Sequence, residues 1–217
     1  RDRRARREVG LSTADAVAVV LWVGETLYEV FGGAVSGAVM GSQLAGQGER
    51  GQRARALVDW AIGPVWEANH VWLIFVLVAC WTGFPTAFGA IMSTLIVPFF
   101  LEAIGIIMRG SAFAFRGQAA TVSQQRFFGA VFATSSVLTP FFLGAAVGAI
   151  ASGRVPAGNA PGDIISSWAN PTSVRIGLLA VANGAYLAAV YLTADAQRGN
   201  LDDLVERMRL RALGAGA

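Results

Sequence analysis

The residues best suited to chemistry lie in "GPVWEANHVWLI", residues 63–74, where a carboxylate, an amide and an imidazole interrupt an apolar run. Glu67 and His70 are three residues apart, so both lie on the same face of a helix. An acid and an imidazole on one face can carry protons when a partner or water is near. The stretch therefore predicts a proton path, with Glu67, Asn69 and His70 as its candidates.

Carboxylates also interrupt two other apolar runs. Glu25 and Glu29 are one turn apart on one helix face, and ionisable residues in a membrane helix are costly, so both join the proton-path candidates. The alternative, that their neutral forms merely hydrogen-bond to helix neighbours, stays open. Glu102 stands among large apolar residues, which favours a structural or subunit-contact role.

A haem ligand is a further interpretation of His70, because histidine is a common axial ligand. An interior histidine that only hydrogen-bonds is favoured over it. Trp66 and Trp72 are expected to pack or to anchor the membrane interface. The sequence contains no Walker-type Gly-Lys loop, no paired-cysteine metal site and no nucleophile with an obvious base. No catalytic residue and no metal ligand is therefore assigned.

The elements that must position these residues are membrane helices. Of 217 residues, 54% are hydrophobic and 14% are charged, whereas a soluble domain carries about 25% charged residues. The charges are clumped, and the runs between them reach about 20 residues, enough to cross roughly 30 Å of hydrocarbon. The sequence predicts an all-α, polytopic transmembrane bundle of about five spanning helices plus a C-terminal amphipathic helix.

Turn signals set the expected boundaries. Gly83 and Pro85 in "TGFP" end one helix and begin the next, and Thr139-Pro140 predicts a kink. The tail 201–213 has apolar residues at helical spacing, which predicts an amphipathic helix lying at the surface. The expected spans are 14–41, 56–82, 86–109, 127–151 and 172–194. The chain divides into a basic N-terminal segment 1–13, a transmembrane domain 14–195 and a charged amphipathic tail 196–217.

The arginines predict the orientation. They gather in the loops after the first and third helices and in the tail, whereas the connection between the fourth and fifth helices holds Arg154 alone, with Arg175 near the start of the fifth. Cytoplasmic loops are rich in arginine, so the first set is expected in the cytoplasm and the N-terminus outside. Five arginines among the first eight residues favour the reverse. Aromatic residues are not interleaved with the arginines, so no nucleic-acid partner is expected.

Three stretches in order, "GPVWEANHVWLI" (63–74), "GFPTAF" (83–88) and "MRGSAFAFRG" (108–117), resemble subunit II of the cytochrome bd-type quinol oxidases. The later stretches 138–150 and 183–195 are compatible with the same family. The resemblance covers nearly all of the chain after about residue 14. The first stretch is the specific one, because Trp-acid-x-Asn-x-Val-Trp-Leu is an improbable chance sequence in a membrane helix.

The resemblance implies a membrane subunit of a respiratory complex that oxidises quinol and reduces oxygen to water. It implies that subunit I, the partner, binds the haems and the quinol, while subunit II supports it and contributes to proton or oxygen access. No cofactor is assigned directly to this chain, although a bound quinone is a candidate. The expected surroundings are lipid of the bacterial cytoplasmic (inner) membrane. This chain by itself is not expected to be catalytic.

The resemblance also assigns residues. Glu67 takes the position of the family's acidic residue in a hydrophilic proton path, and Trp66 and Asn69 match directly. Arg109 and Arg116 resemble the basic residues after the third helix.

The departures from the family pattern bear on the proton path. "GGAVSG" (32–37) has Val35 where the family usually carries an aspartate, so a path through the first helix depends on Glu25 or Glu29. Glu102 falls where an apolar residue is expected, and His70 where the family varies. The family's chain continues to further helices, so the sequence is expected to be either truncated or a reduced relative. An alternative from another class is a secondary transporter or channel subunit, with Glu25, Glu29 and Glu102 along an ion path.

Overall fold

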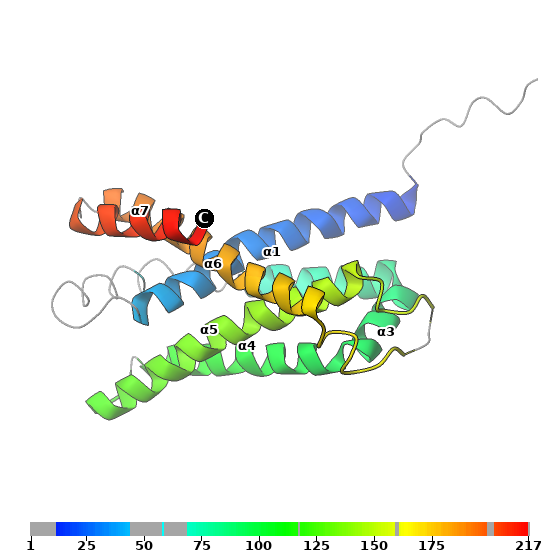
Figure 1. Ribbon diagram of the computed structural model, residues 1–217, viewed down its shortest axis with the longest axis horizontal. Helices are drawn as coiled ribbons and strands as arrows, with labels where there is room; N and C mark the ends of the chain where they lie inside the picture. Colours follow the sequence, from blue (N-terminus) through cyan, green and yellow to red (C-terminus); the bar gives the residue numbers. More distant parts are fainter. Residues whose placement is uncertain are drawn as a thin grey trace, which may run out of the picture.

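The computed structural model describes residues 12–43, 58, 69–116, 118–158, 161–198 and 202–216, and no strand occurs among them. The chain in these ranges forms a helical bundle (Figure 1). Its helices are α1 (Thr13–Gln43), an unlabelled helix Asn69–Gly83, α3 (Pro85–Thr94), α4 (Ile96–Arg116), α5 (Val122–Ala151), α6 (Pro171–Arg198) and α7 (Asp202–Gly216).

Four of these helices are long and apolar enough to cross a membrane, and the bent pair Asn69–Gly83 and α3 makes a fifth if it counts as one span. The prediction of about five spans in an all-α membrane protein is therefore confirmed. The bend between the two helices of that pair is 119°. It falls at Phe84, within the predicted "TGFP" turn, and Pro85 begins α3 as expected.

The third predicted span, 86–109, was wrong as a single helix. The chain breaks at Leu95, between the end of α3 at Thr94 and the start of α4 at Ile96. Pro98 explains the break, because its nitrogen has no hydrogen for the carbonyl of Thr94 and its ring would clash with that carbonyl in a continuous helix.

The fourth span begins five residues earlier than the predicted residue 127, because a cap precedes it. Thr121 Oγ1 accepts from the backbone N–H of Gln124 at 3.2 Å, and the Gln124 side-chain oxygen accepts from the backbone N–H of Thr121 at 3.2 Å. This reciprocal pair satisfies two amides that an uncapped helix would leave unbonded. α5 continues through Pro140 to Ala151 as one helix.

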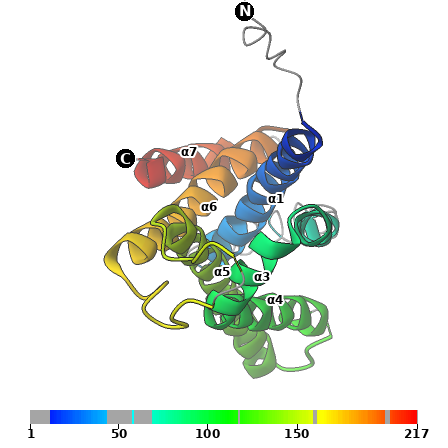
Figure 2. The same ribbon diagram turned by 90° about the vertical axis from the view of Figure 1, so that its right-hand side faces the viewer.

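α5 lies in the middle of the bundle, in contact with α4, α6 and α1 (Figure 2). The helix Asn69–Gly83 lies antiparallel beside α1, since Asn69 packs at Gly32 whereas Gly83 packs at Val17. α1 and α6 cross with their backbones in contact at Gly37, where a Cβ would overlap the carbonyl oxygen of Gly184. Close crossings at small residues are typical of membrane helices, because packing rather than water exclusion holds them together.

α7 confirms the predicted C-terminal amphipathic helix. One apolar side of α7 packs on α6: Leu204 and Met208 are buried with Ala188 and Leu192, and Val205 packs against the same cluster. Burying this stripe removes apolar surface from water. Leu201, also predicted on this stripe, lies outside the described residues.

The two ends of the bundle separate the loops as the arginines predicted. The end of α1, the end of α4, the start of α5 and α7 lie at one end of the bundle, while the start of α1, α3 and the loop residues 152–158 and 161–170 lie at the other (Figure 1). Which end faces the cytoplasm stays a prediction.

The loop between α5 and α6 is held by Asp163. Its Oδ1 accepts from the backbone N–H of Ser166 at 2.6 Å and of Ile165 at 2.9 Å, and these bonds lower the pKa of the Asp163 carboxyl below its ordinary value of 3.8. A carboxyl with a lowered pKa stabilises the fold above its unfolded pKa and loses that effect as the pH falls through the folded value.

We expect hydrogen exchange to show this directly. After correction for intrinsic rates, the protection of the Ile165 and Ser166 amides should be constant from pH 7 to about 4 and fall below that. Asp163→Ala should lose the protection severalfold at every pH, whereas Asp163→Asn, which keeps the acceptor, should remove the pH dependence. A pH profile in Asp163→Asn identical to the wild type would contradict the assignment.

Candidate functional site

A buried arginine ties α4 to α1. Arg109 is 2% exposed, and its Nη1 donates a hydrogen bond to Ser36 Oγ at 2.6 Å. An arginine is rarely buried without partners, because removing its charge from water is costly. Its placement among helices of a membrane protein therefore marks a functional or assembly site.

Glu102 and Tyr28 complete the charged surroundings of Arg109. Glu102 lies two turns before Arg109 on the same face of α4 and is 5% exposed. Its carboxyl interacts electrostatically with Arg109 and with Glu29 of α1, and the buried Tyr28 interacts with all three. Arg109 therefore interacts with one carboxyl group, that of Glu102, and with the phenol of Tyr28.

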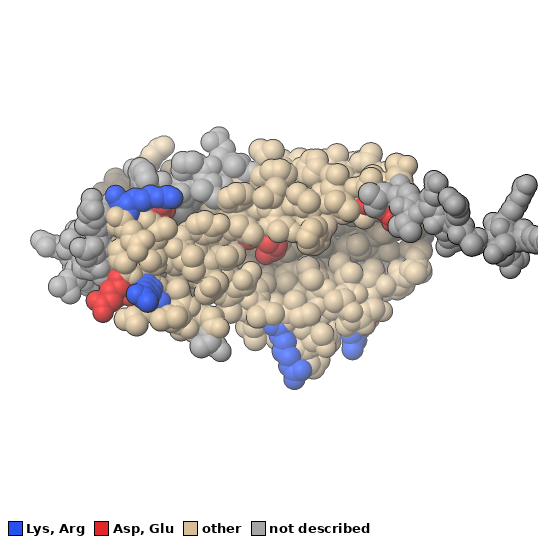
Figure 3. All heavy atoms as spheres, turned by 90° about the horizontal axis from the view of Figure 1, so that it is seen from above, with Lys and Arg blue, Asp and Glu red and all other residues tan. Residues whose placement is uncertain are grey.

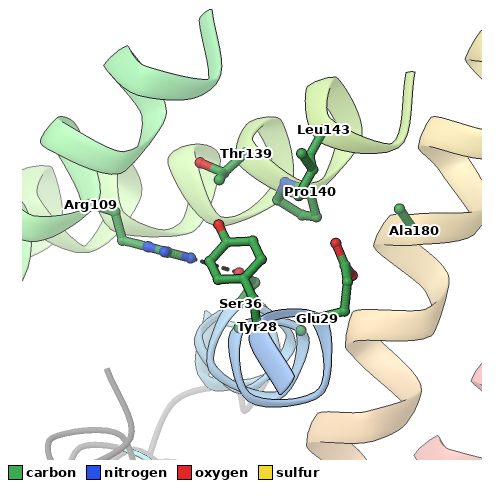
Figure 4. A pocket seen from close by; sticks show the side chains of 10 residues that line it. Tyr28, Glu29, Ser36, Arg109, Thr139, Pro140, Leu143 and Ala180 are labelled. Carbon is green, nitrogen blue, oxygen red and sulfur yellow. Dashed lines mark hydrogen bonds between the residues drawn. The ribbon is translucent and has the colours of Figure 1, made fainter. Parts of the chain in front are cut away.

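A small cavity lies against Arg109, between α1, α4, α5 and α6 (Figure 4). It offers about 20 Å³ to the centres of water molecules. Two polar atoms of its lining residues, Arg109 Nε and Thr139 Oγ1, are buried with no hydrogen-bond partner among the residues that the structure describes. Figure 4 shows Arg109 extending from α4 toward Ser36, with Tyr28 between Arg109 and Glu29 in this view. The cavity thus joins buried polar groups of three helices.

A larger groove of about 500 Å³ adjoins this cavity along α1, α5 and α6. Its polar lining includes Glu25, Glu29 and Asn183, set among apolar residues such as Trp22 and Leu179. Glu29 lines both the groove and the cavity. Seen from above, acidic atoms lie in the middle of an otherwise uncharged stretch of the molecule (Figure 3). Glu25 and Glu29, which were predicted to lie on one helix face, therefore line the same groove.

Asn69 connects the opening motif to the same region. Its side chain is 2% exposed and fills the notch left by Gly32, where a Cβ would stand 2.7 Å from the Asn69 amide nitrogen. Gly32 also lines the cavity. Asn69 Oδ1 is buried without a hydrogen-bond partner among the described residues. Asn69 of the motif and the cavity therefore both lie against α1 at Gly32.

The sequence model of the family described as cytochrome bd terminal oxidase subunit II matches residues 13–217. The chain belongs to this family. Among curated proteins, the "Cytochrome bd ubiquinol oxidase subunit 2" of Bacillus subtilis (strain 168) is 32% identical over 125 residues, which are 58% of this chain and 35% of the relative. The match thus spans about a third of the relative's length. The resemblance in "GPVWEANHVWLI" is confirmed at the level of the family.

Several residues that the subunit II motifs single out lie where no side chain is described. Glu67 and Trp66 lie outside the described residues, and Arg116 ends α4 with its side chain undescribed. His70 is half-buried in the helix Asn69–Gly83 and has an interaction partner. Trp72 packs edge-on against Phe75 with 5.9 Å between ring centroids. Among the described residues, no group of three His, Cys, Asp or Glu side chains could hold a metal ion.

Three residues that line the cavity were not among the candidates predicted from the sequence: Tyr28, Ser36 and Thr139. Tyr28 directly precedes the predicted Glu29, and Ser36 directly follows Val35. Their positions beside residues already singled out are a weak sequence signal for the site. Val35 itself is buried in an apolar cluster, whereas Ser36, the next residue, accepts from Arg109. Val35 and Ser36 therefore face different sides of α1.

Proposed function

We propose that this chain is the subunit II of a bd-type terminal oxidase, a complex of the bacterial cytoplasmic membrane that oxidises quinol and reduces oxygen to water. The observation that carries the proposal is the family match over residues 13–217. In this role the chain supports a haem-bearing subunit I, and the electron transfer takes place in that partner. The multi-pass helical architecture is consistent with such a role.

Within the complex, we assign this chain a contribution to proton delivery. Three observations support it: Asn69 of the motif is buried against α1, Glu25 and Glu29 line one groove, and the buried Arg109 interacts with the buried Glu102. Glu67 is the proposed proton-carrying residue of the motif, because it occupies the acidic position of the family. Asn69 and His70 would hold and tune it from the same helix.

Glu67→Gln in the intact complex tests this assignment. Glutamine keeps the shape of the side chain but cannot carry a proton, so proton uptake and quinol-dependent oxygen consumption should fall by roughly 100-fold, the lower end of what a positioned proton-transferring group contributes. Haem content should not change. Glu206→Gln, an exposed position on α7, is the matched control and should leave turnover intact. Wild-type turnover in Glu67→Gln would refute the assignment.

Co-expression with a subunit I separates the oxidase from a transporter or channel. The proposal expects oxygen consumption that depends on quinol and on both chains. An ion flux through vesicles that contain this chain alone, with no oxidase activity in the pair, would overturn it.

A further inference from the structure

A buried threonine of α5 lacks the hydrogen bond that other helical threonines of this chain make. Thr26, Thr82 and Thr193 each donate to the backbone carbonyl four residues earlier in the same helix, a common bond for a helical hydroxyl. Thr139 is 3% exposed, yet its Oγ1 has no hydrogen-bond partner among the described residues. Burying a hydroxyl without a partner is unfavourable, so Thr139 indicates a bound molecule.

A second buried polar group with the same deficit lines the same cavity. Arg109 Nη1 donates to Ser36 Oγ, but Arg109 Nε, which can only donate, has no partner in the part of the chain that the structure describes. Arg109 and Thr139 both line the cavity between α1, α4, α5 and α6. A donor and a hydroxyl at one cavity are partners that a water molecule can bridge.

Gly105 brings the two groups to the same turn of α4. It lies one helical turn before Arg109, and a Cβ at this position would stand 2.5 Å from Thr139 Oγ1. The Thr139 hydroxyl therefore fills a notch in α4 that exists because residue 105 has no side chain. Side chains of a helix lean toward its N-terminus and cover the preceding turn, so Arg109 extends over the turn that receives Thr139. Figure 4 shows both side chains at the cavity, one from α4 and one from α5.

The size and the charge of the cavity favour water as the bound molecule. Roughly 10–15 Å³ is enough for the centre of one water, which needs two to four polar partners, and the cavity offers about 20 Å³. A cation would be repelled by the guanidinium of Arg109, and an anion would stand beside the carboxyl group of Glu29, which also lines the cavity. Water is neutral and can accept from Arg109 while it bonds to Thr139.

We propose that one internal water accepts a hydrogen bond from Arg109 Nε and bonds to Thr139 Oγ1, and that Thr139 thereby positions the guanidinium. Arg109 is then bonded to α1 directly, through Ser36 at 2.6 Å, and to α5 through the water. Bonds in two directions fix the orientation of the guanidinium, and one side chain joins three helices. The inference goes beyond the proposed function, because it concerns how this arginine is held and involves no proton transfer.

The test uses the intact chain in lipid nanodiscs, with isotope-labelled arginine side chains for magnetic resonance. The Hε resonance of Arg109 should receive magnetisation from a bound water. A high-resolution crystal structure of the same chain should show one density peak within hydrogen-bond distance of both Arg109 Nε and Thr139 Oγ1.

Two substitutions at position 139 and one control assign the role of the hydroxyl. Thr139→Val removes the hydroxyl at nearly constant volume and should abolish the water signal and the density peak, whereas Thr139→Ser keeps the hydroxyl and should retain both. Thr193→Val is the matched control, because the Thr193 hydroxyl bonds to the Ala189 carbonyl at 2.7 Å within its own helix. It should leave the Arg109 resonance unchanged.

Three results would overturn the inference. One is a wild-type chain without the water signal and the density peak, and another is a Thr139→Val variant in which both persist. The third is a peak with the anomalous signal of bromide after soaking, which would identify an anion. If Thr139→Val does not fold, the peak must still be present in both the wild type and Thr139→Ser. An inactive oxidase would refute the proposed function alone, because these measurements need no turnover.

Discussion

Arg109→Met is expected to lower the free energy of unfolding by about 3–5 kcal/mol, the cost of removing one partner from a buried charged cluster. Arg109 is almost fully buried, and its charge faces Glu102 and Tyr28. Methionine fills a similar volume, so the loss is of charge and of the hydrogen bond to Ser36 rather than of packing. Reversible unfolding of the purified protein in detergent, followed by circular dichroism, measures the change.

A second substitution identifies the source of that cost. In Arg109→Met with Glu102→Gln no buried carboxylate is left at position 102, so the destabilisation should fall to less than half of the single variant's value. Arg198→Met is the matched control, because Arg198 pairs with Asp195 at 3.2 Å on an exposed surface, where such a pair contributes about 0.5 kcal/mol or less. Equal losses in Arg109→Met and Arg198→Met would show that the buried cluster carries no stability.

Gly37→Ala should destabilise the bundle by about 3 kcal/mol, the upper end of the range for overpacking. A methyl group at this position would overlap the Gly184 carbonyl oxygen, which belongs to the backbone of α6 and cannot rotate away. α1 and α6 would have to separate, and their contact also holds Ala188 and Leu192 in the core. The measurement is the same detergent unfolding experiment.

Gly89→Ala is the control for the chemical change itself. Gly89 lies within α3, and a Cβ there meets nothing within 4 Å. Alanine in place of glycine in a helix interior gains about 1 kcal/mol of helix propensity, so this variant should be as stable as the wild type or more so. If Gly37→Ala behaved like Gly89→Ala, the close crossing of α1 and α6 would be refuted.

The helices themselves were predictable because their signals are local. Long apolar runs predict spans, and Gly83 and Pro85 predict the turn that the structure places at Phe84. Leu95 was not predicted as a break, although Pro98 carries the reason three residues later. The start of α5 was missed because apolar residues were sought and the Thr121 cap was not. Boundaries depend on hydrogen bonds that hydropathy does not encode.

The site was predictable only in part. Sequence spacing placed Glu25 and Glu29 on one face, and the groove confirms that they lie together. Spacing along one helix says nothing about its neighbours, so the sequence did not predict that Ser36 bonds to Arg109 or that Thr139 lines the same cavity. Glu102 was expected to have a structural or subunit-contact role, and that role stays a prediction; the structure buries its side chain on the face of α4 that carries Arg109.

The sequence by itself determined that this is a multi-pass helical membrane protein of the subunit II family, because apolar length and an ordered motif are properties of the chain read residue by residue. Only the tertiary structure decided which polar residues share an environment. The Gly37 crossing and the Gly105 notch set how closely α1, α4, α5 and α6 approach, and that approach places Arg109, Ser36 and Thr139 around one cavity. Interactions between distant segments depend on backbone proximity, which residue types in a single helix do not specify.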